Sequence, residues 1–251
     1  MPEHSDKIKV NALPKVIRQP VQDFSGKLTE TLGGNLESIT VVGSSLTEDY
    51  VEGRSDINTV LVVRDRPLEA AKQIAGMGRT MRGKPIAAPL IMSRRYIERS
   101  RDVFCIELLD LQLNHKTIFG ADPFADLIFE KTHVRLQCER ELKASLVRLR
   151  QGYIAAAGHT RLVREVVAAA AHSLIPLLRA MLWLKDHPRP ILVEDVIAKA
   201  AGVFSFDPDM LMAANMWRVA KVRIDKELMD KALRSIYKTV DSLAEVVDKL
   251  E

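Results

Sequence analysis

Residues 41–63, VVGSSLTEDYVEGRSDINTVLVV, place groups that can bind phosphate at the end of an apolar segment of strand length. Gly43, Ser44 and Ser45 follow that segment directly. A glycine turn of this kind offers backbone N–H donors to a triphosphate, and the serine hydroxyls add further donors. The turn is therefore a candidate phosphate-binding element.

Asp56 and Asn58 open the next apolar segment. Alternation along a strand puts residues i and i+2 on one face, so both side chains should point to the same side. Divalent cations bind to such oxygens when they stand on rigid strands. A third acid should come from a neighbouring strand, and Glu107 stands in the apolar run 103–111, where a lone acid costs free energy unless it is paired or bound.

The stretch VGSSLTEDYVEGRSDINTVLVV resembles the signature of nucleotidyltransferases of the DNA polymerase beta type. Gly43 and Ser44 match its glycine turn, 11 residues separate Ser44 from Asp56, and Asp56 and Ile57 match its acid and the apolar residue after it. The next position departs from the pattern, because Asn58 stands where the family carries its second metal-binding carboxylate.

The run IELLDL, followed by NHKTIFGADPF, resembles the segment of small bacterial nucleotidyltransferases that bears the third carboxylate, which makes Glu107 the matching position. The resemblance implies that Gly43 and Ser44 hold a nucleoside triphosphate and that Asp56 binds Mg²⁺. It implies that Glu107 either binds metal or removes the proton from an acceptor hydroxyl. Asn58 can ligate a cation through its amide oxygen but brings no charge, so we expect weakened metal binding.

Two functions remain open at this point. The first is Mg²⁺-dependent transfer of a nucleotidyl group from a nucleoside triphosphate to a hydroxyl of a small molecule or a protein. The second is a catalytically degenerate protein that keeps the fold and acts as a nucleotide-binding or regulatory module. Residue 58 motivates the second, because function depends on the site and not on the fold.

Strands alternate with helices over residues 1–125, which predicts an α/β domain with a mixed sheet. Pro89 should confine its strand to an edge of the sheet. The expected strands are 38–43, 56–63, 86–92 and 103–111, and the expected helices are 20–34, 67–80 and 93–100.

Residues 126–251 have helical periodicity almost throughout and predict an all-α bundle domain, similar in kind to those appended to aminoglycoside and lincosamide nucleotidyltransferases. The segment ERELKASLVRLRQGY carries Arg140, Lys143 and Arg148, which would reach the triphosphate under the functional reading, and Glu141, which would serve as acceptor base. The alternative is an ordinary solvated helix face.

The closing segment places Leu233, Ile236, Val240, Leu243, Val247 and Leu250 at intervals of 3, 4, 3, 4 and 3 residues. This spacing marks one apolar face of a helix. It predicts either a place in the core of the bundle, which we favour, or the seam of a homodimer.

Composition narrows the classes of protein. The 37 Lys and Arg exceed the 33 Asp and Glu by four. Residues 1–130 hold 17 basic against 18 acidic side chains, and residues 131–251 hold 20 against 15, so the excess lies in the second half. The excess of basic side chains suits binding of an anionic small molecule, whereas an aromatic content of only 5% argues against binding of nucleic acid.

The longest uncharged stretch of the Ala-rich region, residues 166–178, is too short for a membrane span, and the first residues do not form a secretory signal, so we expect a cytoplasmic protein. The two cysteines, Cys105 and Cys138, are expected to be free thiols. The histidines lack the spacing of zinc ligands.

Overall fold

The computed structural model describes residues 8–78, 85–217 and 224–250. The chain forms two compact units, each with a hydrophobic core of its own. The first unit comprises Met1–Arg101 and Leu111–Ile128, and the second comprises Asp102–Asp110 and Phe129–Glu251. The division lies close to the expected boundary after residue 125, except that 102–110 packs with the helical unit.

A four-stranded mixed sheet organises the first unit. Strand β1 pairs antiparallel with both β2 and β4, and β2 pairs parallel with β3, in the order β3-β2-β1-β4. Strand β3 follows Pro89 and lies at an edge, as predicted for a proline-containing segment. The strands are β1 (Leu36–Val42), β2 (Asn58–Val63), β3 (Leu90–Met92) and β4 (His115–Gly120).

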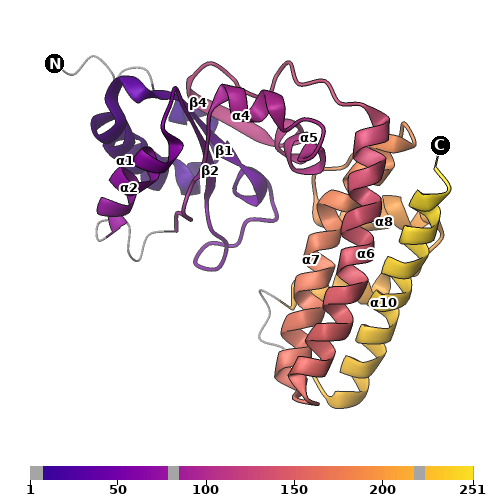
Figure 1. Cartoon of the computed structure of the whole chain (residues 1–251). Helices are drawn as coiled ribbons and strands as arrows, with labels where there is room; N and C mark the ends of the chain where they lie inside the picture. Colours follow the sequence, from indigo (N-terminus) through magenta and orange to yellow (C-terminus); the bar gives the residue numbers. More distant parts are fainter. Residues whose placement is uncertain (1–7, 79–84, 218–223, 251) are drawn as a thin grey trace. The chain divides into compact units, whose positions relative to one another are not determined.

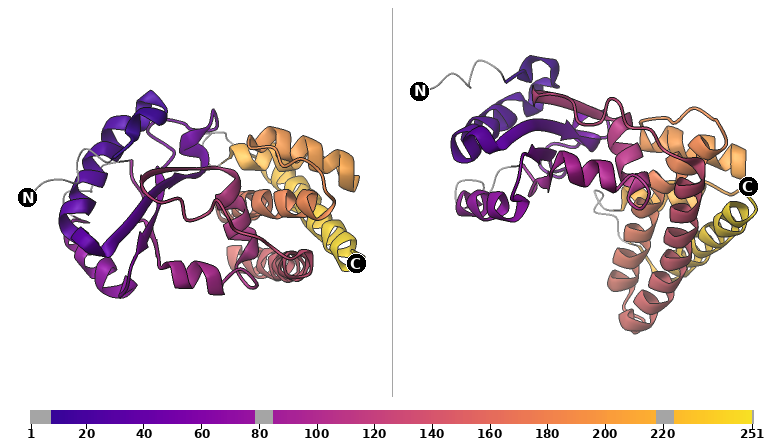
Figure 2. Two further views of the ribbon diagram at one scale, coloured as in Figure 1. Left: turned by 90° about the horizontal axis from the view of Figure 1, so that it is seen from above. Right: turned by 45° about the horizontal axis from the view of Figure 1, so that its top comes forward.

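Helices α1 (Lys15–Leu32) and α2 (Pro67–Gly76) lie beside the sheet (Figures 1 and 2). Their apolar faces share a core with the inward side chains of β1 and β2, among them Ile39 and Leu61, which are fully buried. Helix α1 begins five residues earlier than predicted and includes Pro20. It ends as predicted at Gly33, whose φ of 49° is accessible to glycine at little cost.

The segment before β4 corrects the predicted fold. Residues Cys105–Leu113 form helix α5 and not a strand, and the strand β4 that follows was not predicted. The predicted short helix is present as α4 (Arg94–Arg99), and the Ser93 hydroxyl caps it by accepting a hydrogen bond from the backbone N–H of Tyr96. The part of the predicted helix 67–80 beyond residue 78 lies outside the described residues.

The described residues of the second unit form helices joined by loops, as predicted for an all-α unit. Its long helices α6, α7 and α10 pack side by side (Figure 1). The helices are α6 (Lys131–Ala156), α7 (Thr160–Leu184), α8 (Val193–Phe204), α9 (Asp209–Met216) and α10 (Lys226–Asp248).

The regular apolar face of α10 lies in the core of this unit. Ile236, Val240, Leu243 and Val247 are each at most 1% exposed and belong to one cluster with residues of α6 and α7. The structure therefore favours the core reading of this face over a dimer seam.

Helix α7 is long and apolar enough to span a membrane by length and composition, but 67% of the relevant window is buried within the protein. The central helix of a soluble bundle has the same length and composition, so burial in the core explains the apolar character of α7.

Candidate functional site

The glycine turn after β1 is held in place by the start of β4. Gly43 has a φ of 77°, and the short 3-10 helix η4 (Gly43–Leu46) begins there. The side-chain amide of Asn114 donates a hydrogen bond to the Gly43 carbonyl oxygen at 3.0 Å, and the Gly43 N–H donates to the Asn114 carbonyl oxygen at 3.3 Å. Asn114 thus fixes the turn from two sides, a role that the sequence pattern did not indicate.

Asp56 and Asn58 lie on one face next to this turn. Ile57 between them is fully buried while both polar residues are exposed, as strand alternation predicts. Asn58 pairs with Val42 in the β1–β2 ladder. A Cβ placed on Gly43 would lie 3.8 Å from Asn58 Nδ2, so the amide rests against the turn.

The two serines of the turn have different environments. Ser45 is 1% exposed, and its hydroxyl donates to the Val42 carbonyl oxygen at 3.4 Å. Ser44 is half-buried, and its carbonyl oxygen accepts a hydrogen bond from the Thr47 hydroxyl at 3.0 Å. Of the two hydroxyls expected to bind phosphate, only that of Ser44 keeps access to solvent.

Acidic side chains gather on the loop between η4 and β2. Burial raises the pKa of the Tyr50 hydroxyl, and the negative charges of Glu52 and Asp56 raise it further. The same negative charges would repel a free triphosphate. A cation between the phosphates and these carboxylates removes the repulsion, so the electrostatics favour a nucleotide that binds together with a cation.

The prediction that Glu107 lies on a strand beside β2 is wrong. The neighbours of β2 are β1 and β3, whereas Glu107 is on α5 in the helical unit. Its Oε2 accepts a hydrogen bond from Gln137 Nε2 at 2.7 Å. The side-chain oxygen of Gln137 accepts hydrogen bonds from the Cys105 thiol at 3.0 Å and the Ile106 N–H at 2.9 Å, so Glu107 belongs to a network that ties α5 to α6.

Asp110 on the same helix has an ionic partner. Arg179 Nη1 lies 2.8 Å from Asp110 Oδ1, and the other guanidinium nitrogens of Arg179 donate to the carbonyl oxygens of Pro190 and Ile191. Only 12% of the Arg179 side chain is exposed. This ion pair anchors α5 within the helical unit.

Among the described residues that pair with β2 on the side of β3, none carries a carboxylate. The segment paired with β2 runs from Ile86 to Met92, and its residues are apolar, alanine or proline. Within the described part of the chain, no group of three His, Cys, Asp or Glu side chains could hold a metal ion.

Asp56 and Asn58 could supply oxygen ligands to one Mg²⁺ ion, which would take its other ligands from nucleotide phosphates and water, because Mg²⁺ commonly takes only one or two carboxylates from a protein. They do not fit a pair of ions, since a two-metal site needs bridging carboxylates on both sides.

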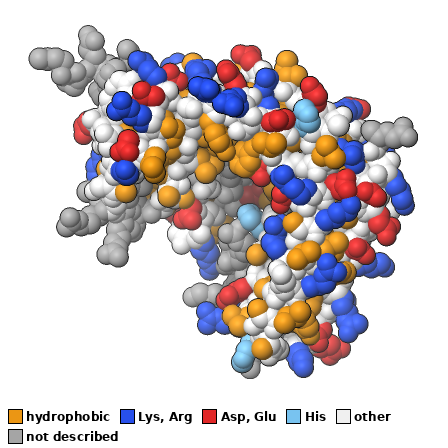
Figure 3. Space-filling view, in the orientation of Figure 1, with side chains coloured by type: hydrophobic (Ala, Val, Ile, Leu, Met, Phe, Trp, Pro, Cys, Tyr) orange, Lys and Arg blue, Asp and Glu red, His pale blue; other side chains and the backbone are white. Residues whose placement is uncertain are grey.

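The basic residues of α6 are engaged with acids of the helical unit. Lys143 lies 3.5 Å from Asp248 and also pairs with Glu139, and Arg140 and Arg148 pair with Glu141 at 3.3 and 3.5 Å. More than half of each of the three basic side chains is exposed. In Figure 3, basic and acidic side chains are interspersed over this unit, as on a solvated helix face.

The two cysteines are free thiols, as predicted, and both are buried. Burial raises the pKa of the Cys105 thiol to about 11 and also raises that of Cys138, so neither is a reactive thiolate at neutral pH.

The chain was compared with protein-family models, curated proteins and solved structures. No family model matches, and no curated protein matches. Among solved structures, the chain is similar to spectinomycin adenyltransferase AAD(9) from Enterococcus faecialis, crystallised with ATP and spectinomycin. The TM-score is 0.59 with 12% identity, over 89% of this chain and 98% of the neighbour.

This chain has the nucleotidyltransferase fold. The mixed sheet followed by a helical unit is the architecture that the Gly43–Asp56 motif implied, and the likeness extends over most of both chains. An identity of 12% establishes the fold and leaves the chemistry to the residues of the site.

Proposed function

We propose that the protein binds a nucleoside triphosphate and Mg²⁺ at the Gly43 turn and transfers a nucleotidyl group to a hydroxyl of a small molecule. The observation that carries the proposal is the convergence of the Gly43 turn with Asp56 and Asn58 on one face, within the nucleotidyltransferase fold. The ATP and antibiotic bound by the structural neighbour support a nucleotide donor and a small acceptor. Such a reaction suits a cytoplasmic protein, because nucleoside triphosphates are made and used there.

The residues of the turn would act by binding and orientation. The Ser44 hydroxyl and the backbone of η4 would contact the phosphates, while Asp56 supplies the one protein charge at the metal position. When bound, Mg²⁺ would neutralise charge that develops on the phosphates. Asn58 would orient a phosphate or complete the cation's oxygen ligands without adding charge.

Transfer also needs a general base that removes the proton from the acceptor hydroxyl. Glu107 and Glu141 were the predicted bases, and both are engaged by hydrogen-bonding or ionic partners within the helical unit. They remain predictions, to be tested by Glu107→Gln and Glu141→Gln in the transfer assay. The basic residues Arg140, Lys143 and Arg148 likewise remain predicted contacts of the triphosphate.

The transfer reaction can be tested with nucleoside triphosphates labelled at the α-phosphate, in the presence of Mg²⁺ and a panel of hydroxylated acceptors that includes spectinomycin. We expect the labelled nucleotidyl group to appear on an acceptor with release of pyrophosphate, a reaction that Asp56→Asn abolishes and that Asp126→Asn, an exposed acid elsewhere on the first unit, leaves intact. Absence of release with every nucleotide and acceptor would count against transfer.

The second candidate is a nucleotide-binding module without transfer. Two specific observations favour it: Asn58 in place of an acid, and the apolar segment Ile86–Met92 where a third carboxylate would be needed. Calorimetry with a non-hydrolysable nucleoside triphosphate separates the cases. Binding that needs Mg²⁺ supports the transferase, binding that persists in EDTA supports the module, and absence of binding contradicts both.

A further inference from the structure

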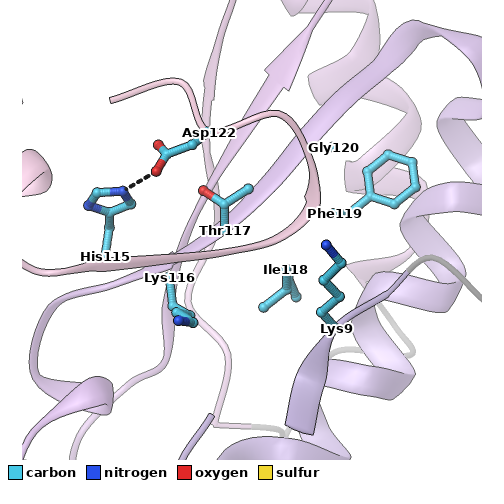
Figure 4. A pocket seen from close by; sticks show the side chains of 8 residues that line it. All are labelled: Lys9, His115, Lys116, Thr117, Ile118, Phe119, Gly120 and Asp122. Carbon is cyan, nitrogen blue, oxygen red and sulfur yellow. Dashed lines mark hydrogen bonds and ion pairs between the residues drawn. The ribbon is translucent and has the colours of Figure 1, made fainter. Parts of the chain in front are cut away.

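A pocket of about 620 Å³ opens along β4, the edge strand of the sheet on the side opposite β3 (Figure 4). It is distinct from the Asp56 face, and none of the predicted site residues lines it. Its charged residues are Lys9, Lys116, His115 and Asp122.

The charges that line this pocket do not cancel. Asp122 is the one acid among the lining residues, and its Oδ2 lies 2.8 Å from His115 Nε2. The second His115 nitrogen, Nδ1, lies 3.1 Å from the Gln112 carbonyl oxygen, so the imidazole is held between Gln112 and Asp122. Lys9 and Lys116 bring two positive charges against the single negative charge of Asp122, so the lining of the pocket has a net positive charge.

The backbone holds Lys9 against this edge of the sheet. The Lys9 N–H donates to the Ile118 carbonyl oxygen at 2.7 Å. This hydrogen bond fixes residue 9 beside β4, so that Lys9 and Lys116 line the same pocket. Two lysines on one pocket suit an anionic ligand.

The pocket adjoins the Gly43 turn through the chain itself. His115 at its end pairs with Val42, the last residue of β1. The residue before His115 is Asn114, whose amide holds the Gly43 carbonyl oxygen. A molecule that occupies the pocket would therefore lie next to the strand end that positions the turn.

We propose that the β4 pocket binds an anionic group, a phosphate or a carboxylate, through Lys9 and Lys116. Its assignment to the acceptor rests on the proposed function: the preferred acceptor of the transfer would then be an anionic small molecule. The competing explanation is that these lysines only prevent edge-to-edge pairing of strands, a common role of lysine on edge strands.

The pocket can be tested by amide NMR of the full chain titrated with two probes, inorganic phosphate and citrate, to separate phosphate from carboxylate binding. We expect saturable shifts at Lys116, Ile118 and Gly120. The double variant Lys9→Gln, Lys116→Gln should weaken binding about tenfold, as expected for the loss of two charge contacts. The control Lys27→Gln, Lys72→Gln removes two charges from the same unit outside the pocket and should leave the affinity unchanged.

Several outcomes overturn the inference. They are the absence of saturable shifts along β4 with both probes, equal weakening by both double variants, or an unchanged affinity in the pocket variant together with increased self-association. A nucleotide titration of the same sample reports on Gly43 separately. If the anions shift the β4 amides but nucleotide does not bind at Gly43, the anion site stands and the proposed function is rejected. If nucleotide binds at Gly43 but the anions do not shift the β4 amides, only the anion site is rejected.

Discussion

Asn58 is the residue on which the chemistry of the site depends. It lies at the start of β2 beside the Gly43 turn and is exposed, while its neutral amide supplies no charge. Sequence spacing sufficed to place Asp56 and Asn58 on one face, because strand alternation is a local property. The amide in place of a second carboxylate is also visible in the sequence. Its effect on the affinity for Mg²⁺ is the subject of the first prediction.

Restoring the acid should strengthen cation binding. Asn58→Asp adds a negative charge on an exposed strand end next to Asp56, and carboxylates bind Mg²⁺ more strongly than amides. We expect the Mg²⁺ affinity, measured by calorimetry with a non-hydrolysable nucleoside triphosphate present, to rise about tenfold. Asp126→Asn serves as a control for the change of one charge. An unchanged affinity would mean that the cation does not bind at β2.

The pair of Asp122 and His115 makes stability depend on pH. Burial by itself would raise the pKa of Asp122, but hydrogen bonds from His115 and from the Phe124 N–H outweigh it and lower that pKa below its ordinary value. A carboxyl group with a lower pKa in the folded state stabilises the protein above its unfolded pKa of about 3.9, and this contribution is lost as the pH falls through the folded value.

Asp122→Asn should therefore destabilise the first unit more at pH 7 than at pH 3, where part of the stabilisation is already lost. The side chain is 37% exposed, so water weakens the interaction and we expect a loss of about 0.5–1 kcal/mol in the free energy of unfolding. Urea denaturation at the two pH values measures the difference. A loss of the same size at both would show that the carboxylate charge does not contribute.

At the scale of elements, the turn after β1 was predictable and the segment from 103 to 120 was not. A short apolar run fits a buried strand or a helix face equally well by periodicity. In the structure Cys105, Ile106, Leu108 and Leu109 are buried together, which is the 3.6-residue pattern of a helix. The Leu, Glu and Gln content of α5 was the available signal, since these residues favour helices over strands.

Strand β4 escaped prediction because its polar residues obscure the alternation. It carries His115, Lys116 and Thr117 in succession, and a bulge interrupts its pairing with β1. Because β4 was not predicted, neither the contact of Asn114 with the Gly43 turn nor the pocket along the sheet edge could be inferred from the sequence.

Gly43 offers a test of the turn itself. A Cβ at this position meets no atom closer than 3.8 Å, so Gly43→Ala should cost only the backbone strain of a positive φ, about 1 kcal/mol. Gly53 is a matched control, since its φ of 76° is nearly the same and its surroundings are open. We expect equal losses of stability in denaturation, with nucleotide affinity in calorimetry lowered by Gly43→Ala alone. If the Gly43→Ala and Gly53→Ala variants bind nucleotide with equal affinity, the turn is not part of the nucleotide-binding site.

At the scale of the whole molecule, each unit has its own hydrophobic core, so the sequence signals for each could be interpreted separately. The periodicity of residues 126–251 predicted the helical class because amphipathic helices repeat their pattern over many turns. The regular face of α10 left the core and the dimer seam open, since both place apolar residues at the same intervals. Only burial separates them, and Val240 and Leu243 are at most 1% exposed within one chain.

Leu243→Ala distinguishes these two arrangements in solution. Removing a fully buried leucine side chain from a core costs about 2–5 kcal/mol through lost burial and a residual cavity. The thermal midpoint of the helical unit should fall, and it should not depend on protein concentration in either the parent or the variant. A dimer seam predicts the opposite, because the midpoint of a folded dimer rises with concentration by mass action. Denaturation at two concentrations at least fiftyfold apart, with the exposed Leu228→Ala as control, decides whether α10 completes its own bundle or a partner's.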